Sequence, residues 1–157
     1  MRLSSKARYA VMAMVDLARR EPGKPVSLAE IAEGQEISFS YLEQMFAALR
    51  RAGIVRSVRG PGGGYGLAHP ANDISIADIV SATETGPAPA NTACDPGNPA
   101  NCPIADARCA THGLWAALDE EMARFLSSIS LDAVAHGEFA GAARFLDMKR
   151  DLAATGE

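Results

Sequence analysis

The sequence predicts a mainly α-helical protein with a small β-hairpin wing: a winged helix-turn-helix followed by a long dimerisation helix. Three observations support this prediction. Apolar residues recur at helical spacing in three segments before Gly53, a strand, glycine-rich turn and second strand follow, and a long apolar stripe begins near residue 110. The 157 residues provide room for one compact domain and an appendage.

The first two predicted helices have recognisable start and stop signals. Ser4 and Ser5 can cap a helix that runs to about Arg20. A second helix is expected from Ser27 to Gly34, because Glu30 stands three residues after Ser27 and completes a capping box. The predicted buried face of the first helix comprises Ala7, Ala10, Val11, Met14, Val15 and Ala18.

The third predicted helix begins after Ser38 and ends at Gly53, and Leu42, Met45, Phe46 and Leu49 form its buried stripe. Two short helices joined by a tight turn form a helix-turn-helix, whose second helix lies in the DNA major groove. The side chains that the buried stripe leaves on the outer face of this helix are mostly polar, which suits contacts to base edges and phosphates. A solvated surface helix could present the same residues. The outward positions are Ser40, Tyr41, Glu43, Gln44, Arg50 and Arg51.

A glycine-rich hairpin follows this helix and favours the DNA-binding interpretation. Residues 54–59 are typical of a strand, and the sequence GPGGGYGLA turns the chain back into a second strand. Arg59 stands at the turn beside Gly60 and Pro61, where it can enter a narrow minor groove. A phosphate-binding loop is excluded, because no Lys-Ser/Thr follows the glycines.

Charge is distributed unevenly along the chain. The net charge is −4, but residues 1–70 hold ten Lys/Arg against six Asp/Glu, and residues 71–157 hold five against thirteen. A basic first half and an acidic second half are expected if only the first half meets phosphate. The asymmetry gives mild support to double-stranded DNA as the partner.

The second half is expected to contain a short helix from Ser75 to about Glu84, a Pro/Gly-rich loop, a long helix from about Ala110, and a short helix capped by Ser130. The long helix has the spacing of a helix that packs against a long partner, so we expect antiparallel pairing with a second copy. Packing against the first helix of the same chain is the alternative. The apolar stripe of the long helix comprises Leu114, Leu118, Met122, Phe125 and Ile129.

All three cysteines fall between these helices. Seven residues separate Cys94 from Cys102, six separate Cys102 from Cys109, and two separate Cys109 from His112. Unremarkable thiols on a loop, a zinc site and an iron–sulfur cluster are the competing interpretations, whereas an odd cysteine count disfavours a structural disulfide. Wide spacing fits a cluster better than zinc, whose sites usually include one closely spaced pair, but the ligand set alone does not decide between the two metals.

The chain start carries no cleavable signal sequence, and its apolar runs are too short to cross a bilayer, so we expect a cytoplasmic protein. Neither a membrane partner nor a small-molecule substrate is expected. An enzyme is disfavoured because no nucleophile–base pair or carboxylate pair accompanies the cysteines, and His69 and His136 stand alone. A scaffold that delivers clusters remains a further alternative, which specific DNA binding would exclude.

Three segments are distinctive: MRLSSKARYAVMAMVDLA, EISFSYLEQMFAALRRAGIVRSVRGPGGGYGLA, and the three cysteines ending in CATHGLW. Together they closely resemble the IscR-type iron–sulfur regulators, winged-helix transcription factors grouped with the nitric-oxide sensor NsrR and the iron regulator RirA. The resemblance covers about residues 1–135. It implies a homodimer that binds a palindromic operator and controls iron–sulfur assembly or iron and redox genes.

The resemblance also implies a role for each motif. It implies that Cys94, Cys102, Cys109 and His112 hold a 2Fe–2S cluster, and that Ser38, Ser40, Tyr41, Glu43, Gln44 and the Arg59–Pro61 segment face DNA. Both cysteine gaps are wider than is usual for the family, and the wider first gap resembles that of RirA, whose relatives hold a 4Fe–4S cluster on three cysteines. The resulting organisation is a winged helix-turn-helix domain at 1–84, a cluster-binding loop at 85–112, a dimerisation helix region at 110–135, and a tail at 136–157.

Overall fold

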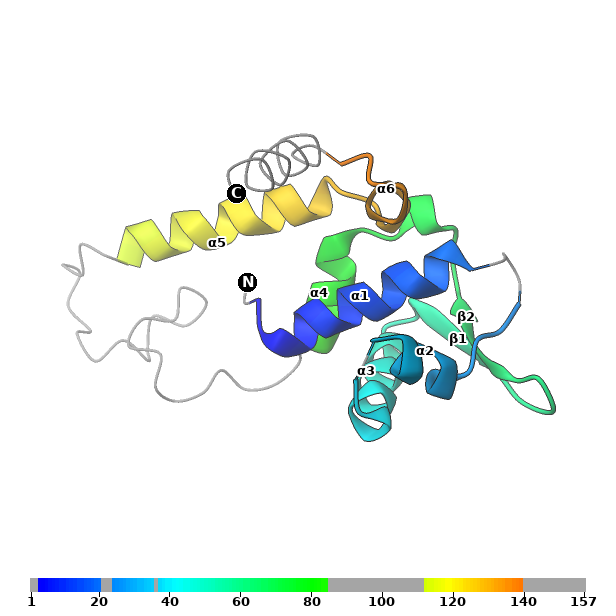
Figure 1. Ribbon diagram of the computed structural model, residues 1–157. Coiled ribbons are helices and arrows are strands. Elements are labelled where there is room, and N and C mark those ends of the chain that lie inside the picture. The colour runs from blue at the N-terminus through cyan, green and yellow to red at the C-terminus, as the bar shows by residue number, and fades with distance from the viewer. Residues whose placement is uncertain (1–2, 21–23, 36, 85–111, 140–157) are drawn as a thin grey trace, which may run out of the picture.

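The first helix lies between the two halves of the structure. The computed structural model describes residues 3–20, 24–35, 37–84 and 112–139, and the side chains of residues 112 and 113 are outside this description. Helix α1 (Ser5–Arg19) begins after Ser4, whose hydroxyl accepts the Ala7 N–H at 3.3 Å. In Figure 1, α1 crosses the centre of the view, with α2, α3 and the hairpin below it and α5 above it. Its buried residues are Ala7, Ala10, Ala13, Met14 and Leu17.

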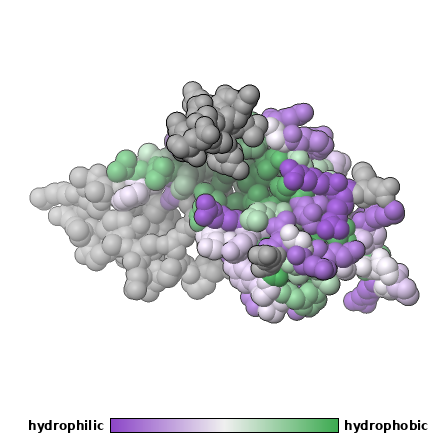
Figure 2. Space-filling view, viewed as in Figure 1, coloured by the Kyte–Doolittle hydropathy of each residue, from purple (hydrophilic) through white to green (hydrophobic). Residues whose placement is uncertain are grey.

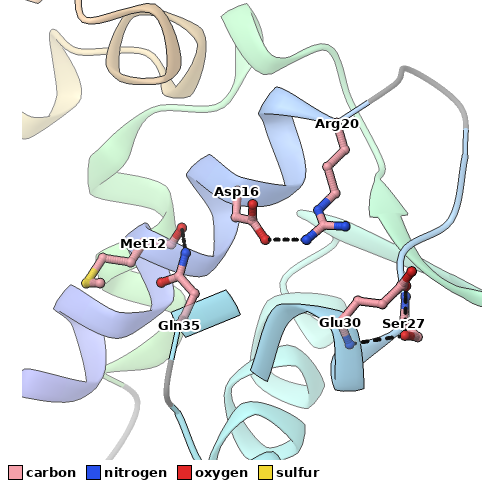
Figure 3. A network of polar contacts seen from close by, with 6 residues as sticks. All are labelled: Met12, Asp16, Arg20, Ser27, Glu30 and Gln35. Atoms are coloured by element: carbon pink, nitrogen blue, oxygen red, sulfur yellow. Dashed lines mark hydrogen bonds and ion pairs between the residues drawn. The ribbon is translucent and has the colours of Figure 1, made fainter. Parts of the chain in front are cut away.

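The predicted helix-turn-helix is confirmed. Helix α2 (Leu28–Gln35) opens on the expected capping box: Glu30 Oε2 accepts the Ser27 N–H at 2.9 Å, and the Ser27 hydroxyl accepts the Glu30 N–H at 3.3 Å. The helix passes the expected stop at Gly34 by one residue. Gln35 donates from Nε2 to the Met12 carbonyl at 3.4 Å, which joins the end of α2 to α1, as Figure 3 shows.

Helix α3 (Phe39–Arg51) ends where Gly53 adopts a left-handed φ of 75°, a conformation that glycine tolerates best. Ser38 occupies the predicted N-cap position, but its side chain makes no capping hydrogen bond. The Ser38 carbonyl instead accepts the N–H groups of Tyr41 and Leu42, each at 3.1 Å. The hydroxyl of Ser38 is therefore not used to begin the helix.

The predicted wing is a two-stranded antiparallel hairpin. Strand β1 (Val55–Val58) pairs with β2 (Gly64–Leu67), with Val55 opposite Leu67 and Val58 opposite Gly64. The segment before α2 adds a bridge to this hairpin: Tyr65 donates its N–H to the Val26 carbonyl at 2.8 Å and accepts the Val26 N–H at 2.9 Å. The wing is thus held to the chain that leads into α2.

The hairpin is followed by a short 3₁₀ helix, η1 (Ala71–Asp73), which the sequence pattern did not predict, and by α4 (Ile76–Thr83). Ser75 opens α4 with a complete capping box, since its hydroxyl accepts the Asp78 N–H at 3.1 Å and Asp78 Oδ2 accepts the Ser75 N–H at 3.0 Å. Helix α4 packs against α1, α3 and α5 and so connects both halves of the fold.

The long helix, α5 (His112–Ser127), and the last helix, α6 (Leu131–His136), both occur where the sequence predicts them. The turn between them is fastened to the start of α4, because Ile76 donates to the Ile129 carbonyl at 3.0 Å and Leu131 donates to the Ile74 carbonyl at 2.8 Å. Helix α6 packs against α1, where Arg19 Nε donates to the Ala135 carbonyl at 2.9 Å.

The apolar core joins α1, α3 and α4 and reaches into the C-terminal segment. Phe46, Met14, Leu42, Ile79 and Leu131 are each fully buried within it. Ile129, predicted as part of the stripe that faces a second copy, is instead buried in the core of its own chain. Among the helices that the structure describes, none has the length and apolarity needed to cross a membrane.

Candidate DNA-binding surface and metal ligands

Helix α3 separates an apolar inner face from a polar outer face. Leu42, Met45, Phe46, Ala48 and Leu49 are buried, and they fix the rotation of the helix about its axis. The structure leaves most of the predicted DNA-facing residues of this segment exposed to solvent: Ser38, Ser40, Glu43, Gln44, Arg50 and Arg51.

Tyr41 differs from the other predicted contacts because it is only partly exposed. Its ring meets that of Tyr9 edge-on, with the ring centroids 6.1 Å apart, and it packs against the hydrophobic core. Tyr41 therefore connects α3 to α1. A contact between Tyr41 and DNA stays a prediction.

The tip of the wing has the backbone conformation that its glycines make available. Gly60 has a φ of 110°, which an L-amino acid side chain rarely accommodates, and the Gly63 N–H closes the turn by donating to the Gly60 carbonyl at 2.9 Å. Arg59, Gly60 and Pro61 are all exposed at this tip. At Gly64, a Cβ atom would collide with the backbone of Val26, so the close approach between β2 and that segment requires glycine.

Tyr65 holds the wing against α3, a role that the sequence pattern does not predict. Its ring meets that of buried Phe46 at a centroid distance of 4.9 Å and an interplanar angle of 63°. The backbone of the same residue forms the bridge to Val26. The only sequence signal is an aromatic residue directly after the glycine run, in a strand position that can face the core. Through Tyr65, α3 and the wing form one packed unit.

The exposed charges on this unit are mainly positive. Glu43 is the single acidic residue of α3, and Arg50 and Arg51 follow it at the C-terminal end of the same helix.

At the start of α2, hydrogen bonds from Ser27 hold the pKa of Glu30 below its ordinary value, and the nearby Arg20 adds a smaller effect in the same direction. Figure 3 shows Arg20 also paired with Asp16, at 3.0 Å. Glu30 is thereby kept ionised as part of the helix cap.

Three of the four predicted metal ligands, Cys94, Cys102 and Cys109, lie outside the described residues. His112 is the first residue of α5, and its side chain is likewise not described. In the parts of the chain that are described, no three His, Cys, Asp or Glu side chains form a group that could hold a metal. His136 lies beside its own helix, with Nδ1 3.0 Å from the Asp132 carbonyl oxygen.

The described chain before the cysteine segment ends in a long-range contact. Glu84, the C-cap residue of α4, accepts the Ser4 N–H through Oε1 at 3.0 Å. Ser4 is in turn the N-cap of α1. The point where the chain leaves α4 is therefore tied directly to the beginning of α1, the helix that packs against α2 and α3.

Helix α5 presents a row of apolar side chains that its own chain does not cover in the described structure. Leu114 is 61% exposed and Phe125 is 51% exposed, while Trp115 and Leu118 are also exposed. Figure 2 shows apolar residues along this helix next to the purple, hydrophilic surface around α1. Contiguous exposed apolar side chains often mark interaction surfaces in soluble proteins.

Comparisons with known proteins agree with this geometry. Residues 3–137 match a family described as "Rrf2: Iron-dependent Transcriptional regulator". The chain is 49% identical over 132 residues to the HTH-type transcriptional regulator IscR of Xenorhabdus nematophila, covering 84% of this chain and 77% of the relative. It is 46% identical over 138 residues to IscR of Photorhabdus laumondii, covering 88% and 81% of the two chains.

Two solved structures share the fold. The IscR structure from T. potens superposes with a TM-score of 0.67 and 36% sequence identity, covering 85% of each chain. The structure of CymR, the global cysteine regulator of B. subtilis, superposes with a TM-score of 0.68 and 31% identity, covering 87% of this chain and 97% of the other.

Proposed function

This chain belongs to the Rrf2 family of transcriptional regulators, and from that premise we propose that an iron–sulfur cluster sets which DNA operators it prefers. The observation that supports DNA recognition in this proposal is the exposed polar face of α3 beside a wing that is packed against it through Tyr65 and Phe46. Such a unit can meet the major groove and the neighbouring minor groove together.

The residues of the reading surface have separate tasks in this proposal. Ser40, Glu43 and Gln44 contact base edges from the first turns of α3, where recognition helices reach deepest. Arg50 and Arg51 bind phosphates, with the hydroxyl of Ser38 and the ring of Tyr41 as further contacts. Arg59, Gly60 and Pro61 bring the wing tip to the minor groove, because a tight turn with an arginine fits a narrow groove.

Glu43 gives this surface its selectivity. A carboxylate among phosphates lowers affinity unless it accepts a hydrogen bond from a cytosine amino group. Sites that offer a cytosine amino group at that position are accepted and other sites are penalised. A Glu43→Ala variant should therefore bind a broader range of sequences. An unchanged ranking of operators in this variant would contradict the role of Glu43.

Helix α5 supplies the dimer interface. Its exposed residues Leu114, Trp115, Leu118 and Phe125 would be covered by antiparallel pairing with α5 of a second copy, and this two-fold arrangement fits a palindromic operator. The exposed face begins after His112, the last predicted cluster ligand. Residues at the dimer interface and the ligand segment are therefore adjacent in the chain.

The donor set fits an iron–sulfur cluster chemically, since thiolates are its usual ligands and imidazole can replace one of them. Cys94, Cys102, Cys109 and His112 would hold it. We favour a 2Fe–2S cluster because His112 supplies a fourth ligand, with a 4Fe–4S cluster on the three cysteines as the alternative. When bound, the cluster supplies a response to iron, oxygen or redox state. The cytoplasm is the compartment that this chemistry requires, because it keeps thiols reduced.

The chain's own residues carry the response to the reading surface. Glu84 stands directly before the ligand segment and bonds to the N-terminus of α1, and α1 packs against both helices of the helix-turn-helix. Ligation by residues that lie between this contact and the start of α5 would favour one orientation of the two reading surfaces in the dimer. If the cluster stabilises one of these orientations over the other by a few kcal/mol, that free-energy difference suffices to change operator choice.

Spectroscopy of protein purified without oxygen tests the cofactor. The wild type should be coloured and should show an iron–sulfur Mössbauer signal, whereas Cys102→Ser should lose most of the visible absorbance. Retention of that absorbance in Cys102→Ser would overturn the ligand assignment. A colourless wild type with one zinc per chain would instead support a zinc-stabilised winged-helix regulator, the remaining candidate for this ligand set.

A further inference from the structure

Phe39 is a large apolar side chain that the structure leaves in solvent on the recognition helix. It is the first residue of α3, and its side chain is 49% exposed. The other large aliphatic and phenyl side chains of this fully described helix, Leu42, Met45, Phe46 and Leu49, are buried. Helical spacing alone would group Phe39 with that stripe, so its exposure is a property of the packed structure.

The position of Phe39 relative to Glu43 indicates what it meets. Residues four apart on a helix lie on the same face, one turn from each other. Phe39 therefore stands beside Glu43 at the end of the helix that enters the groove first, with the exposed Ser38 and Ser40 as its chain neighbours. The first turn of a recognition helix is where side chains reach base edges.

The major groove offers this ring one apolar partner. Base edges there present hydrogen-bond donors and acceptors, and the exception is the C5-methyl group of thymine. A phenyl ring cannot satisfy the donors and acceptors but can cover the methyl group. We propose that Phe39 is a specificity-determining residue that selects a thymine through its C5-methyl group, next to the base that Glu43 reads.

A protein partner is a less suitable occupant for this side chain. The apolar row that fits a second copy lies on α5, and Figure 1 shows α5 above and α3 below the central helices α1 and α4. The packing of α4 against both α3 and α5 agrees with that separation. Phe39 is thus placed on the reading surface and away from the proposed dimer surface. The inference rests on the DNA-binding function proposed above.

Replacing thymine by uracil tests the contact at the level of one methyl group. The wild-type protein first selects a duplex from a random-sequence library, and each thymine is then changed to deoxyuridine symmetrically in both half-sites. Base pairing and all groove hydrogen-bonding groups stay the same. At the thymine that contacts Phe39, loss of the methyl group should lower the affinity of the wild-type protein by about fourfold for each half-site, the factor expected for one buried methyl group. Because both half-sites change, the affinity for the whole palindrome should fall by about fifteenfold.

Variants of the protein assign that loss to Phe39. Phe39→Ala should bind the thymine and uracil duplexes with nearly equal affinity, while Phe39→Leu should keep most of the difference. Met12→Ala is the matched control, because Met12 is 46% exposed but lies on α1. It should retain the full preference for thymine. Circular dichroism should show that Phe39→Ala remains folded at the temperature of the binding assay, since the side chain is half in solvent and is not part of the buried core.

Two results would overturn the assignment of Phe39. One is a selected duplex in which no thymine-to-uracil change weakens binding by wild type. The other is a Phe39→Ala protein that still discriminates thymine from uracil as wild type does. Failure of the wild type to select any duplex would be a different result, since it would refute DNA recognition itself.

Discussion

Replacing Tyr65 with alanine removes the side chain that joins the wing to the recognition helix. Truncation of a fully buried aromatic residue costs about 3–5 kcal/mol of unfolding free energy. Tyr65 is half-buried, and its main ring contact is with Phe46 at 4.9 Å, so we expect a loss of about 2 kcal/mol. The two backbone hydrogen bonds to Val26 do not depend on the side chain, and the hairpin should therefore remain folded.

The same substitution should weaken DNA binding more than a change of stability alone would. Without the ring, the wing tip loses its fixed position beside α3, and the contact made by Arg59 becomes less favourable. One lost charged contact corresponds to about 1.4 kcal/mol or more, which is about tenfold in affinity. Urea denaturation followed by circular dichroism measures the loss of unfolding free energy. Fluorescence anisotropy with a labelled duplex at constant salt measures the loss of DNA affinity.

Two control variants separate this effect from general damage. Tyr65→Phe keeps the ring and should lose less than about 1 kcal/mol with little change in DNA affinity. Tyr9→Ala removes the contact between the rings of Tyr9 and Tyr41, whose centroids are 6.1 Å apart. This contact joins α1 to α3 and does not involve the wing. An unfolding free energy for Tyr65→Ala within about 0.5 kcal/mol of wild type would refute the anchoring role. Unchanged DNA affinity despite lower stability would refute the coupling between the wing and α3.

Three further predictions concern the helix caps and the dimer. Ser75→Ala should lower the free energy of unfolding by about 1 kcal/mol because it removes the cap of α4, and denaturation curves equal to wild type would contradict this. Glu30 has a lower pKa in the folded protein than in the unfolded chain. Its ionised form therefore stabilises the fold at pH values above the pKa of Glu30 in the unfolded chain, and this stabilisation is lost as pH falls through the pKa of Glu30 in the folded protein. Glu30→Gln should weaken the pH dependence of stability in that acidic range, and an identical pH profile would refute the assignment. Leu118→Glu places a charge on the exposed face of α5 and should convert a dimer to monomers in light scattering, whereas the same change at the exposed Val58 of the wing should leave the dimer intact.

Local signals in the sequence were sufficient to locate most of the secondary structure. The capping pair of Ser27 and Glu30, the start of α4 at Ser75, and the glycine turn after Arg59 each occur where the sequence predicts them. These features depend on residues a few positions apart, whose side chains act on the neighbouring backbone. Sequence reasoning is strongest for interactions of this kind.

Contacts between distant segments were not predictable in the same way. The bridge between Val26 and Tyr65 uses backbone groups, which every residue carries, so the sequence gives no specific signal for it. Ile129 follows the periodicity of the α5 stripe, yet the bridge between Ser75 and Ser130 turns that end of the chain into the core. Periodicity identifies a face of a helix, but it does not identify which partner covers that face.

The candidate site divides along the same line. The polar outer positions of α3 followed from its buried stripe, and the structure leaves Glu43 and Gln44 exposed as expected. The partial burial of Tyr41 against Tyr9 and the exposure of Phe39 depend on how α3 packs against α1, which helical spacing does not determine. The ligand set of three cysteines and a histidine stays a prediction from the sequence and from the family.

Control of operator choice by the cluster can be measured as the affinity of cluster-loaded and cluster-free protein for a common panel of duplexes. Both samples are prepared from one anaerobic purification, with the cluster removed from half by chelation, and each is titrated against the panel at constant salt. We predict that the order of preference among the duplexes changes when the cluster is removed. Equal affinities and an equal order of preference in the two samples would contradict the proposed link between the ligand segment and the reading surface.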